Sequence, residues 1–398
     1  MFDIERELEG FESELIALRR DFHENPELGF KEFRTSQIIY DYLKKLNLDV
    51  KNIAKTGVVA VLDGRYGEEG KTVLLRANMD ALPMDELTEL PYTSKNLGVM
   101  HAAGHDAQMA ILLVTAKILA RHRKEFKGSI KFVFQPNEEV TGALDMINAG
   151  ILETPKVDAA FALDFWSEIE SGSIGLSSGP VLGTTEEFEI SIFGKAANTS
   201  APHKGRDAIL GAAKIIDALQ LLITREYTPF CPIAIMIGQI NGGTARNLIS
   251  DYVKLGGTIR FLFDNEHENK AKIINSFKRV IKSVCDMCML DYDINFIPSN
   301  PSLINDPGLV KMMKECVKEA YGGDECIKEF KSLIGEDFAE VSQRIPSVMA
   351  FLGINNPEKG IIYPLYHPKF TVDEAVLKYG VQLYVRSTMK YLMEDDDK

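Results

Sequence analysis

The sequence AQMAILLVTAKILAR at residues 107–121 lies between TVLL at 72–75 and IKFVF at 130–134. The two short apolar runs are bounded by glycine and charged residues, which is typical of strands buried on both faces of a sheet. The segment between them is long and apolar enough for a buried helix. A strand, a helix and a strand in this order predict an α/β layer with a mainly parallel sheet.

The chain extends this pattern toward its N-terminus. Apolar residues recur at helical spacing from about Ile4 to Leu46, with a break at Asn25-Pro26-Glu27, which predicts two helices joined by a turn. A further apolar run, VVAVL at 58–62, predicts another buried strand. The chain has 398 residues, of which 45% are hydrophobic and 26% charged, so we expect two compact units.

The second unit is indicated by a change of pattern near Gly179-Pro180. From there the sequence predicts a strand, a helix, two strands, a helix and a strand, at 188–192, 207–222, 234–237, 258–262, 266–289 and 292–296. This is the element order of a ferredoxin-like α+β sandwich. After Asn300-Pro301 the chain reads as α/β again. We therefore expect a larger α/β catalytic-type domain, 1–182 and 297–398, with a smaller lid domain, 183–296, inserted into it.

Composition and charge exclude several classes of protein. The formal net charge is −13 and acidic residues are spread along the chain, which argues against a nucleic-acid partner. No run approaches the roughly 18 apolar residues of a membrane span, and the charged start of the chain lacks the features of a secretory signal. Five scattered cysteines fit reduced thiols better than disulfides. We expect a cytoplasmic protein that binds no membrane.

Dense polar chemistry occurs where predicted strands end and where a predicted helix begins, as is typical of functional sites in α/β folds. The segments are Arg76–Pro83, His101–Asp106, Gln135–Glu139 and Gly335–Phe338. Adjacent carboxylates such as Glu138 and Glu139 repel each other unless water or a cation lies between them. A solvated pair remains an alternative, but the apolar strand and Gln-Pro in front of the pair favour a site.

These segments carry a resemblance to a known family, together with Asp21–Phe30, Gly194–His203, Gly242–Asn247 and His367–Phe370. The chain resembles the amidohydrolase branch of the M20 metallopeptidase family, which includes aminoacylases, hippurate hydrolases and auxin-conjugate hydrolases. The resemblance covers nearly the whole chain. It implies hydrolysis of the amide bond of N-acyl amino acids or small peptides by two divalent ions and a carboxylate base.

The resemblance implies five metal-ligand positions, and this sequence keeps the family's residue at only some of them. The family has a bridging cysteine, a histidine two residues later, the second glutamate of the pair and two further histidines. The corresponding residues here are Ala103, His105, Glu139, Asp164 and Tyr366. Ala103 has no ligand atom to bridge two ions, so we expect at most one divalent ion (Zn, Mn or similar), held by His105, Glu139 and Asp164.

Other roles follow from the same resemblance. Glu138 and Asp80 match the catalytic carboxylates, and the hydroxyl of Tyr366 could donate a hydrogen bond to a developing oxyanion. Contacts to an anionic amino-acid substrate would come from the smaller domain, and a homodimer formed through that domain is expected. The residues implied for substrate binding are Asn198, His203, Asn247 and Arg260. Further departures from the family pattern are Asn78, Gln108 and Asn198.

Three hypotheses remain open on the sequence. The first is a modified amidohydrolase with a mononuclear metal site. The second is a catalytically inactive, metal-free homologue that binds an acyl-amino-acid-like ligand. The third is metal-independent acid and base chemistry by Glu138 with His105 or His101.

Overall fold

The computed structural model describes residues 2–65, 70–264 and 266–394. The chain divides into two compact units. The larger comprises 1–179, 304–330 and 337–398, and the smaller comprises 180–303 and 331–336. The first segment of the smaller unit begins three residues before the predicted boundary at 182/183 and ends seven residues after the predicted boundary at 296/297. The segment 331–336 also groups with the smaller unit.

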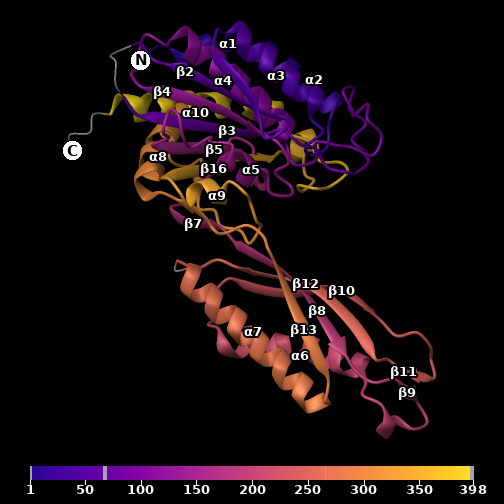
Figure 1. Cartoon of the computed structure of the whole chain (residues 1–398). Coiled ribbons are helices and arrows are strands. Elements are labelled where there is room, and N and C mark those ends of the chain that lie inside the picture. The colour runs from indigo at the N-terminus through magenta and orange to yellow at the C-terminus, as the bar shows by residue number, and fades with distance from the viewer. Residues whose placement is uncertain (1, 66–69, 265, 395–398) are drawn as a thin grey trace. The chain divides into compact units, whose positions relative to one another are not determined.

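An eight-stranded sheet forms the centre of the larger unit, with the order β1-β2-β4-β3-β5-β16-β6-β15 (Figure 1). Strands β4, β3, β5 and β16 run parallel to one another, whereas β1, β2 and β4 pair antiparallel. The sequence-predicted α/β class with a mixed, mainly parallel sheet is therefore confirmed. The strands are β1 (Asp49–Ile53), β2 (Gly57–Asp63), β3 (Thr72–Asn78), β4 (Ser129–Gln135), β5 (Ala159–Glu170), β6 (Ile174–Gly175), β15 (Ile327–Lys328) and β16 (Ser347–Asn355).

Helices cover both faces of this sheet, as Figure 1 shows. Helices α4 and α10 pack on β3, whereas α5 packs on β4 and α9 on β16. The helices are α1 (Ile4–Glu9), α2 (Glu12–Glu24), α3 (Phe33–Lys45), α4 (His105–Arg121), α5 (Gly142–Asn148), α8 (Pro307–Tyr321), α9 (Ala339–Ser342) and α10 (Leu377–Met393). The sequence predicted two helices before residue 46, whereas the structure has three. The chain leaves α1 after Glu9, with Gly10 as the C-cap, and α2 begins after the buried Phe11.

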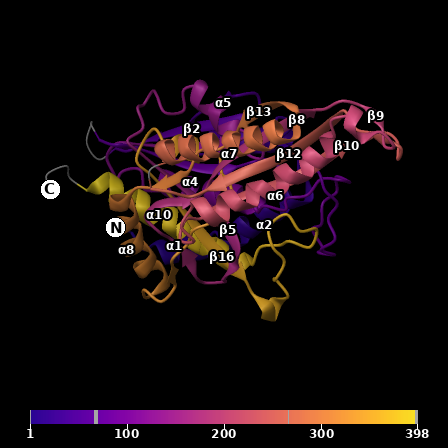
Figure 2. The same cartoon turned by 90° about the horizontal axis from the view of Figure 1, so that it is seen from below.

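The smaller unit contains a four-stranded antiparallel sheet with the order β10-β12-β8-β13. Figure 2 shows α6 and α7 side by side across this sheet, and their apolar residues form the core with those of the strands. The element order is β8 (Thr184–Phe193), α6 (Ala208–Glu226), β10 (Ile233–Gly242), β12 (Tyr252–Phe261), α7 (Glu266–Cys288) and β13 (Asp291–Pro298). A short pair accompanies this sheet, β9 (Ala197–Asn198) with β11 (Leu248–Ile249). Strands β7 (Gly179–Leu182) and β14 (Leu303–Asn305) pair where the chain passes between the two units.

Helix α4 positions the polar segment at 101–106. Its residues are apolar on nearly every side and almost all are buried, so the helix lies inside the larger unit. The residue before it, Gly104, has a left-handed φ of 86°, and a Cβ there would lie 2.7 Å from the ring of Phe165. Only glycine satisfies both conditions. The chain can therefore turn sharply into α4 and place His105 in its first turn.

The structure also bears on the expectations for the cysteines and for membrane spans. All five cysteines lie in the described part of the chain and none forms a disulfide. Among the described residues, no helix combines the length and the apolar character that crossing a membrane requires.

Candidate metal centre

Three potential ligands of a metal ion meet in the larger unit. They are His105, from the first turn of α4, and Glu138 and Glu139, from the turn after β4. One ligand atom from each lies within 4.8 Å of those of the other two. The Nε2 atom of His105 is 3.8 Å from Oε2 of Glu138. His105 is buried and Glu139 is exposed, so the cluster lies at the surface end of α4 and β4.

The imidazole of His105 is fixed by Asp80. Its Nδ1 donates a hydrogen bond to the backbone oxygen of Asp80 at 2.8 Å and lies 3.4 Å from Oδ1 of the same residue. Nε2 is therefore the ring atom that faces the carboxylates, which is the arrangement typical of a metal-binding histidine. Burial alone would lower the pKa of His105, but the hydrogen bond and charge of Asp80, with the charges of Glu139 and Asp164, raise it to about 9.

The turn that carries Glu138 is held by two buried carboxylates. The backbone N–H of Asn137 donates to Oε1 of Glu32 at 3.0 Å, and the N–H of Glu139 donates to Oδ2 of Asp80 at 3.2 Å. The other oxygen of Glu32 accepts a 2.6 Å hydrogen bond from Thr56. Burial raises the pKa of Glu32. Sequence analysis missed Glu32, because only its position just after Asp21–Phe30 distinguishes it from an ordinary surface glutamate.

The donor atoms around His105 suit a bound cation. Within the described part of the chain, the buried Oδ1 of Asn78 has no hydrogen-bond partner, and Oδ1 of Asp80 faces Nδ1 of His105 at 3.4 Å. A buried acceptor left without a partner costs about 1–3 kcal/mol. Both residues contact His105, since Nδ2 of Asn78 is 3.4 Å from its Nε2. A histidine nitrogen and carboxylate oxygens are suitable donors for zinc or manganese.

Asp164, Ala103 and Tyr366 stand where the family has further metal ligands, and none of the three belongs to the three-residue cluster. Asp164, on β5, is outside the three-residue cluster, and its Oδ1 accepts hydrogen bonds from Gln108 and from the N–H of Phe165, both at 2.8 Å. Ala103 is buried and offers only a methyl group. The N–H of Tyr366 donates to the backbone oxygen of Ala102 at 2.9 Å, which places Tyr366 beside the loop before α4, with 46% of its surface exposed.

His101, the other histidine of this loop, is buried, and neither of its ring nitrogens has a hydrogen-bond partner among the described residues. Burial lowers the pKa of His101 to about 4, against the opposing charge of Asp106. His101 is therefore neutral near pH 7 and lies apart from the three-residue cluster.

Within the smaller unit the sequence-predicted substrate residues fall into two places. Asn198 and Asn247 are neighbours, because β9 pairs with β11 and the N–H of Thr199 donates to the backbone oxygen of Asn247. His203 follows in an exposed turn. Arg260 lies toward the other end of β12, about 26 Å along the strand from Tyr252 at a rise of ~3.3 Å per residue. Its Nη1 donates to the backbone oxygen of Leu333 at 3.0 Å.

A network of buried charged residues contacts the first turn of α4 through Asp106. Oδ2 of Asp106 accepts hydrogen bonds from Nε of Arg19 and Nδ1 of His23, both at 2.8 Å. Nε2 of His23 is 3.1 Å from Oε1 of Glu86. Although burial alone would lower the pKa of His23, Asp106 and Glu86 raise it. The network joins α2, α4 and the loop containing Glu86.

Replacing His23 by glutamine is expected to destabilise the protein in a pH-dependent way. Because its folded-state pKa is raised, the charged histidine contributes its full stability below about pH 6.5, the unfolded value, and loses it as pH rises through the folded pKa. Urea unfolding of wild type and His23→Gln should therefore differ by about 1.5–3 kcal/mol at pH 6, with the difference shrinking toward pH 9. A difference that grew with pH would contradict this role.

Asp337, from the last of the four polar segments, serves the framework of the larger unit. Its Oδ1 accepts a hydrogen bond from Nη2 of Arg76 at 2.8 Å, and Nε2 of Gln135 lies 2.8 Å from both of its oxygens. The N–H of Ala143 donates to Oδ2 at the same distance. All three side chains are almost completely buried. The segment thereby fixes the ends of β3 and β4, and the turn after β4 carries Glu138 and Glu139.

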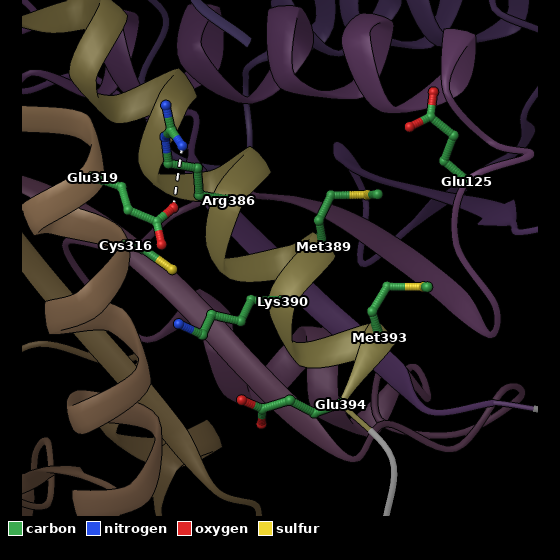
Figure 3. A pocket seen from close by; sticks show the side chains of 8 residues that line it. All are labelled: Glu125, Cys316, Glu319, Arg386, Met389, Lys390, Met393 and Glu394. Carbon is green, nitrogen blue, oxygen red and sulfur yellow. Dashed lines mark hydrogen bonds and ion pairs between the residues drawn. The ribbon is translucent and has the colours of Figure 1, made fainter. Parts of the chain in front are cut away.

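A pocket of about 420 Å³ lies elsewhere on the larger unit, between α8 and α10 (Figure 3). Its two basic side chains form ion pairs, Arg386 with Glu319 and Glu5, and Lys390 with Glu315. The pocket contains none of the residues of the metal cluster. It therefore adds nothing to the candidate centre.

Comparison with known proteins identifies the family to which the chain belongs. The family described as "Peptidase family M20/M25/M40" matches residues 74–390. The chain is 36% identical to the N-acetyl-L-cysteine deacetylase of Bacillus subtilis, covering 98% of this chain and 91% of that protein. It is 35% identical to the thermostable carboxypeptidase 2 of Saccharolobus solfataricus, covering 98% of each. The chain therefore belongs to peptidase family M20.

A solved structure supports the same assignment. The YXEP protein of Bacillus subtilis, described as a dinuclear metal binding peptidase of this family, superposes with a TM-score of 0.83. It is 31% identical in sequence, and the match covers 96% of this chain and 99% of that one. The resemblance drawn from the sequence motifs is confirmed at the level of the family and of the α/β fold.

Proposed function

We propose that the protein hydrolyses the amide bond of an N-acyl amino acid or small peptide at a site holding one divalent ion. The ligands would be His105, Glu139 and Asp164, with Glu138 as the general base. The observation that carries this proposal is that ligand atoms of His105, Glu138 and Glu139 lie within 4.8 Å of one another, beside the buried and unpaired Oδ1 of Asn78. The deacetylase activity named for one relative supports an N-acyl amino acid as the substrate.

Hydrolysis would depend on the ion together with Glu138, Asp80 and Tyr366. When bound, the ion would polarise the scissile carbonyl and lower the pKa of a water molecule. Glu138 would take the proton from that water and return it to the leaving amine. Its side chain is only 10% exposed, which limits competition from bulk water. Asp80 would keep His105 in the tautomer whose Nε2 faces the centre. Tyr366 would donate a hydrogen bond to the developing oxyanion.

The residues of the smaller unit would bind the substrate. We assign the anionic amino-acid portion to Arg260, Asn198, Asn247 and His203, because these polar groups stand at the positions that the resemblance implies for substrate binding. Arg260 lies at the far end of β12 from Tyr252, which follows Asn247 by five residues, so we infer that not all four residues contact one substrate group in one chain. We retain Asn247 and Arg260 as the principal contacts.

The alternative function is binding of an acyl-amino-acid-like ligand without turnover and without a metal. The buried methyl group of Ala103 favours it, because a dinuclear centre needs an anion between its two ions and this residue supplies none. The hydrolase is the better supported of the two, since the base and two ligands are kept and lie together.

The experiment that tests the proposed function is metal-dependent turnover. Purified protein is dialysed against a chelator, then assayed on a panel of N-acetyl and N-benzoyl amino acids with and without added Mn²⁺ or Zn²⁺. We expect amide hydrolysis that the chelator abolishes and one ion restores. A ligand that binds by calorimetry and is recovered intact under every condition would establish the alternative function instead.

We also propose a cytoplasmic homodimer formed through the smaller unit. Strand β10 is an edge strand of its sheet, and its outward side chains Met236 and Ile240 are 62% and 59% exposed. Exposed edges with apolar side chains favour pairing with a second copy. Light scattering should give twice the mass of the chain, and the double variant Met236→Lys/Ile240→Lys should give the mass of one chain. A monomeric wild type at micromolar concentration would contradict the dimer.

A further inference from the structure

Glu32, the residue before α3, joins two other segments of the larger unit at the end of β4. Its Oε1 accepts a hydrogen bond from the N–H of Asn137 at 3.0 Å, and its Oε2 accepts one from the hydroxyl of Thr56 at 2.6 Å. Thr56 directly precedes β2, the antiparallel neighbour of β4. Both side chains are completely or almost completely buried, so these hydrogen bonds are shielded from water.

The turn that Glu32 contacts has an unusual backbone. Asn137 has a φ of 54°, in the left-handed region, which is unfavourable for residues with a Cβ even though asparagine tolerates it better than most. Its backbone oxygen accepts the N–H groups of Thr141 and Gly142 at 3.2 and 2.9 Å. A Cβ at Gly142 would lie only 1.8 Å from the backbone oxygen of Pro136, so the turn is tightly closed. Such a conformation persists where surrounding contacts determine it, and Glu32 supplies one of them.

Glu138 lies between two backbone N–H groups that are both held by buried carboxylates. The N–H of Asn137 is held by Glu32, and the N–H of Glu139 is held by Asp80 at 3.2 Å. The backbone is therefore fixed on each side of the residue that we assign as the general base. A base must lie within hydrogen-bonding reach of the proton that it takes, and a displacement of about 1 Å can cost a factor of about 10² in rate.

We propose that Glu32 is a positioning residue that holds the general base Glu138 in place through the backbone of Asn137. This inference rests on the proposed hydrolysis and adds to it a residue that controls the position of its base. The N–H of Glu139 has its own hydrogen bond to Asp80. Loss of Glu32 should therefore displace the base more than it displaces the metal ligand.

The test is steady-state kinetics at saturating Mn²⁺ on the best N-acyl amino acid found. Glu32→Met keeps the length of the side chain but has no acceptor for the N–H of Asn137, and we expect kcat to fall by about 10–100-fold. KM should stay within about threefold of wild type, because the base acts in the transition state. Glu32→Gln keeps an acceptor oxygen, and we expect it to retain kcat within about fivefold.

The matched control is Lys131→Met, on β4 itself. Lys131 is also a buried charged side chain that holds a loop, since its ammonium group donates to the backbone oxygens of Ile151, Glu153 and Pro155 at 2.5–2.9 Å. Its loss should lower thermal stability and leave kcat within about twofold of wild type. A general loss of stability would affect this variant and Glu32→Met alike.

The variant Glu138→Gln separates a positioning role from a structural one. If Glu32 acts through Glu138, Glu32→Met should cause no further loss of kcat in the Glu138→Gln background. Thermal unfolding checks that each variant is folded. If Glu32→Met does not fold, Thr56→Val takes its place, because it removes the hydroxyl that fixes the carboxylate of Glu32.

Each outcome decides the inference. A loss of kcat that glutamine rescues, and that is absent in the Glu138→Gln background, supports it. A kcat within threefold of wild type for Glu32→Met, an equal loss in both backgrounds, or an equal loss in Lys131→Met overturns it. The proposed hydrolase then stands, since the wild type turns over. No turnover by the wild type with any ion overturns both this inference and the proposed hydrolase.

Discussion

Replacing Glu138 by glutamine is expected to lower kcat for amide hydrolysis by about 10²–10⁴-fold, the usual contribution of a general base. Glutamine keeps the size of the side chain but cannot accept the proton of the attacking water. The position of the residue makes it the base, since its Oε2 lies 3.8 Å from Nε2 of His105 and its backbone turn is held by Glu32 and Asp80. The measurement is steady-state kinetics on the best N-acyl amino acid found.

The control for this experiment is the neighbouring carboxylate. Glu139→Gln should lose metal affinity together with activity, because we assign Glu139 to the ion. Glu138→Gln should retain the bound ion and change KM little, because the lost interaction belongs to the transition state. Retention of more than a tenth of the wild-type kcat by Glu138→Gln would exclude it as the base.

Asparagine in place of Asp337 is expected to destabilise the larger unit by about 3–5 kcal/mol, the range for removing one partner of a buried ion pair. The substitution leaves the guanidinium of Arg76, which is buried almost completely, without its carboxylate. It also replaces one of the oxygens that hold Gln135 and the N–H of Ala143. Urea unfolding followed by tryptophan fluorescence reports the change, since the single tryptophan, Trp166, lies on β5 of this unit.

An exposed ion pair of the same unit provides the comparison. Asp21 binds Arg34 at 2.8 Å, and both side chains are about 40% exposed. Such pairs contribute at most about 1 kcal/mol, so Asp21→Asn should unfold near the wild-type midpoint. Equal effects of Asp21→Asn and Asp337→Asn would show that the buried network does not hold the ends of β3 and β4 as described.

Much of the fold could be predicted because local pattern and tertiary structure agree. The runs at 72–75 and 130–134 became β3 and β4, and the apolar segment at 107–121 became α4, which begins two residues earlier at His105. The break between α1 and α2 escaped prediction, because Phe11 continues the apolar pattern across it. The antiparallel pairing of β1 and β2 with β4 depends on which strands become neighbours, and the pattern of one strand does not determine that.

The sequence motifs predicted the residues of the cluster. They did not predict the supporting residues, which are distant from the cluster in the sequence. His105, Glu138 and Glu139 were expected from the sequence, and the structure brings them together. Glu32 and the Arg19–His23 pair reach the centre through contacts over some 80 to 105 residues of chain. Gln108 was noticed only as a departure from the family pattern. Its function as a link between β3 and β5 depends on hydrogen bonds that no local sequence pattern encodes.

The number of divalent ions per chain tests the central claim most directly. Protein loaded with Mn²⁺ or Zn²⁺ and freed of excess ion would be analysed by elemental analysis and by anomalous diffraction from crystals. We expect one ion per chain, in contact with His105 and Glu139, because Ala103 offers nothing to join a second. Two fully occupied ions side by side in this cluster would contradict the account.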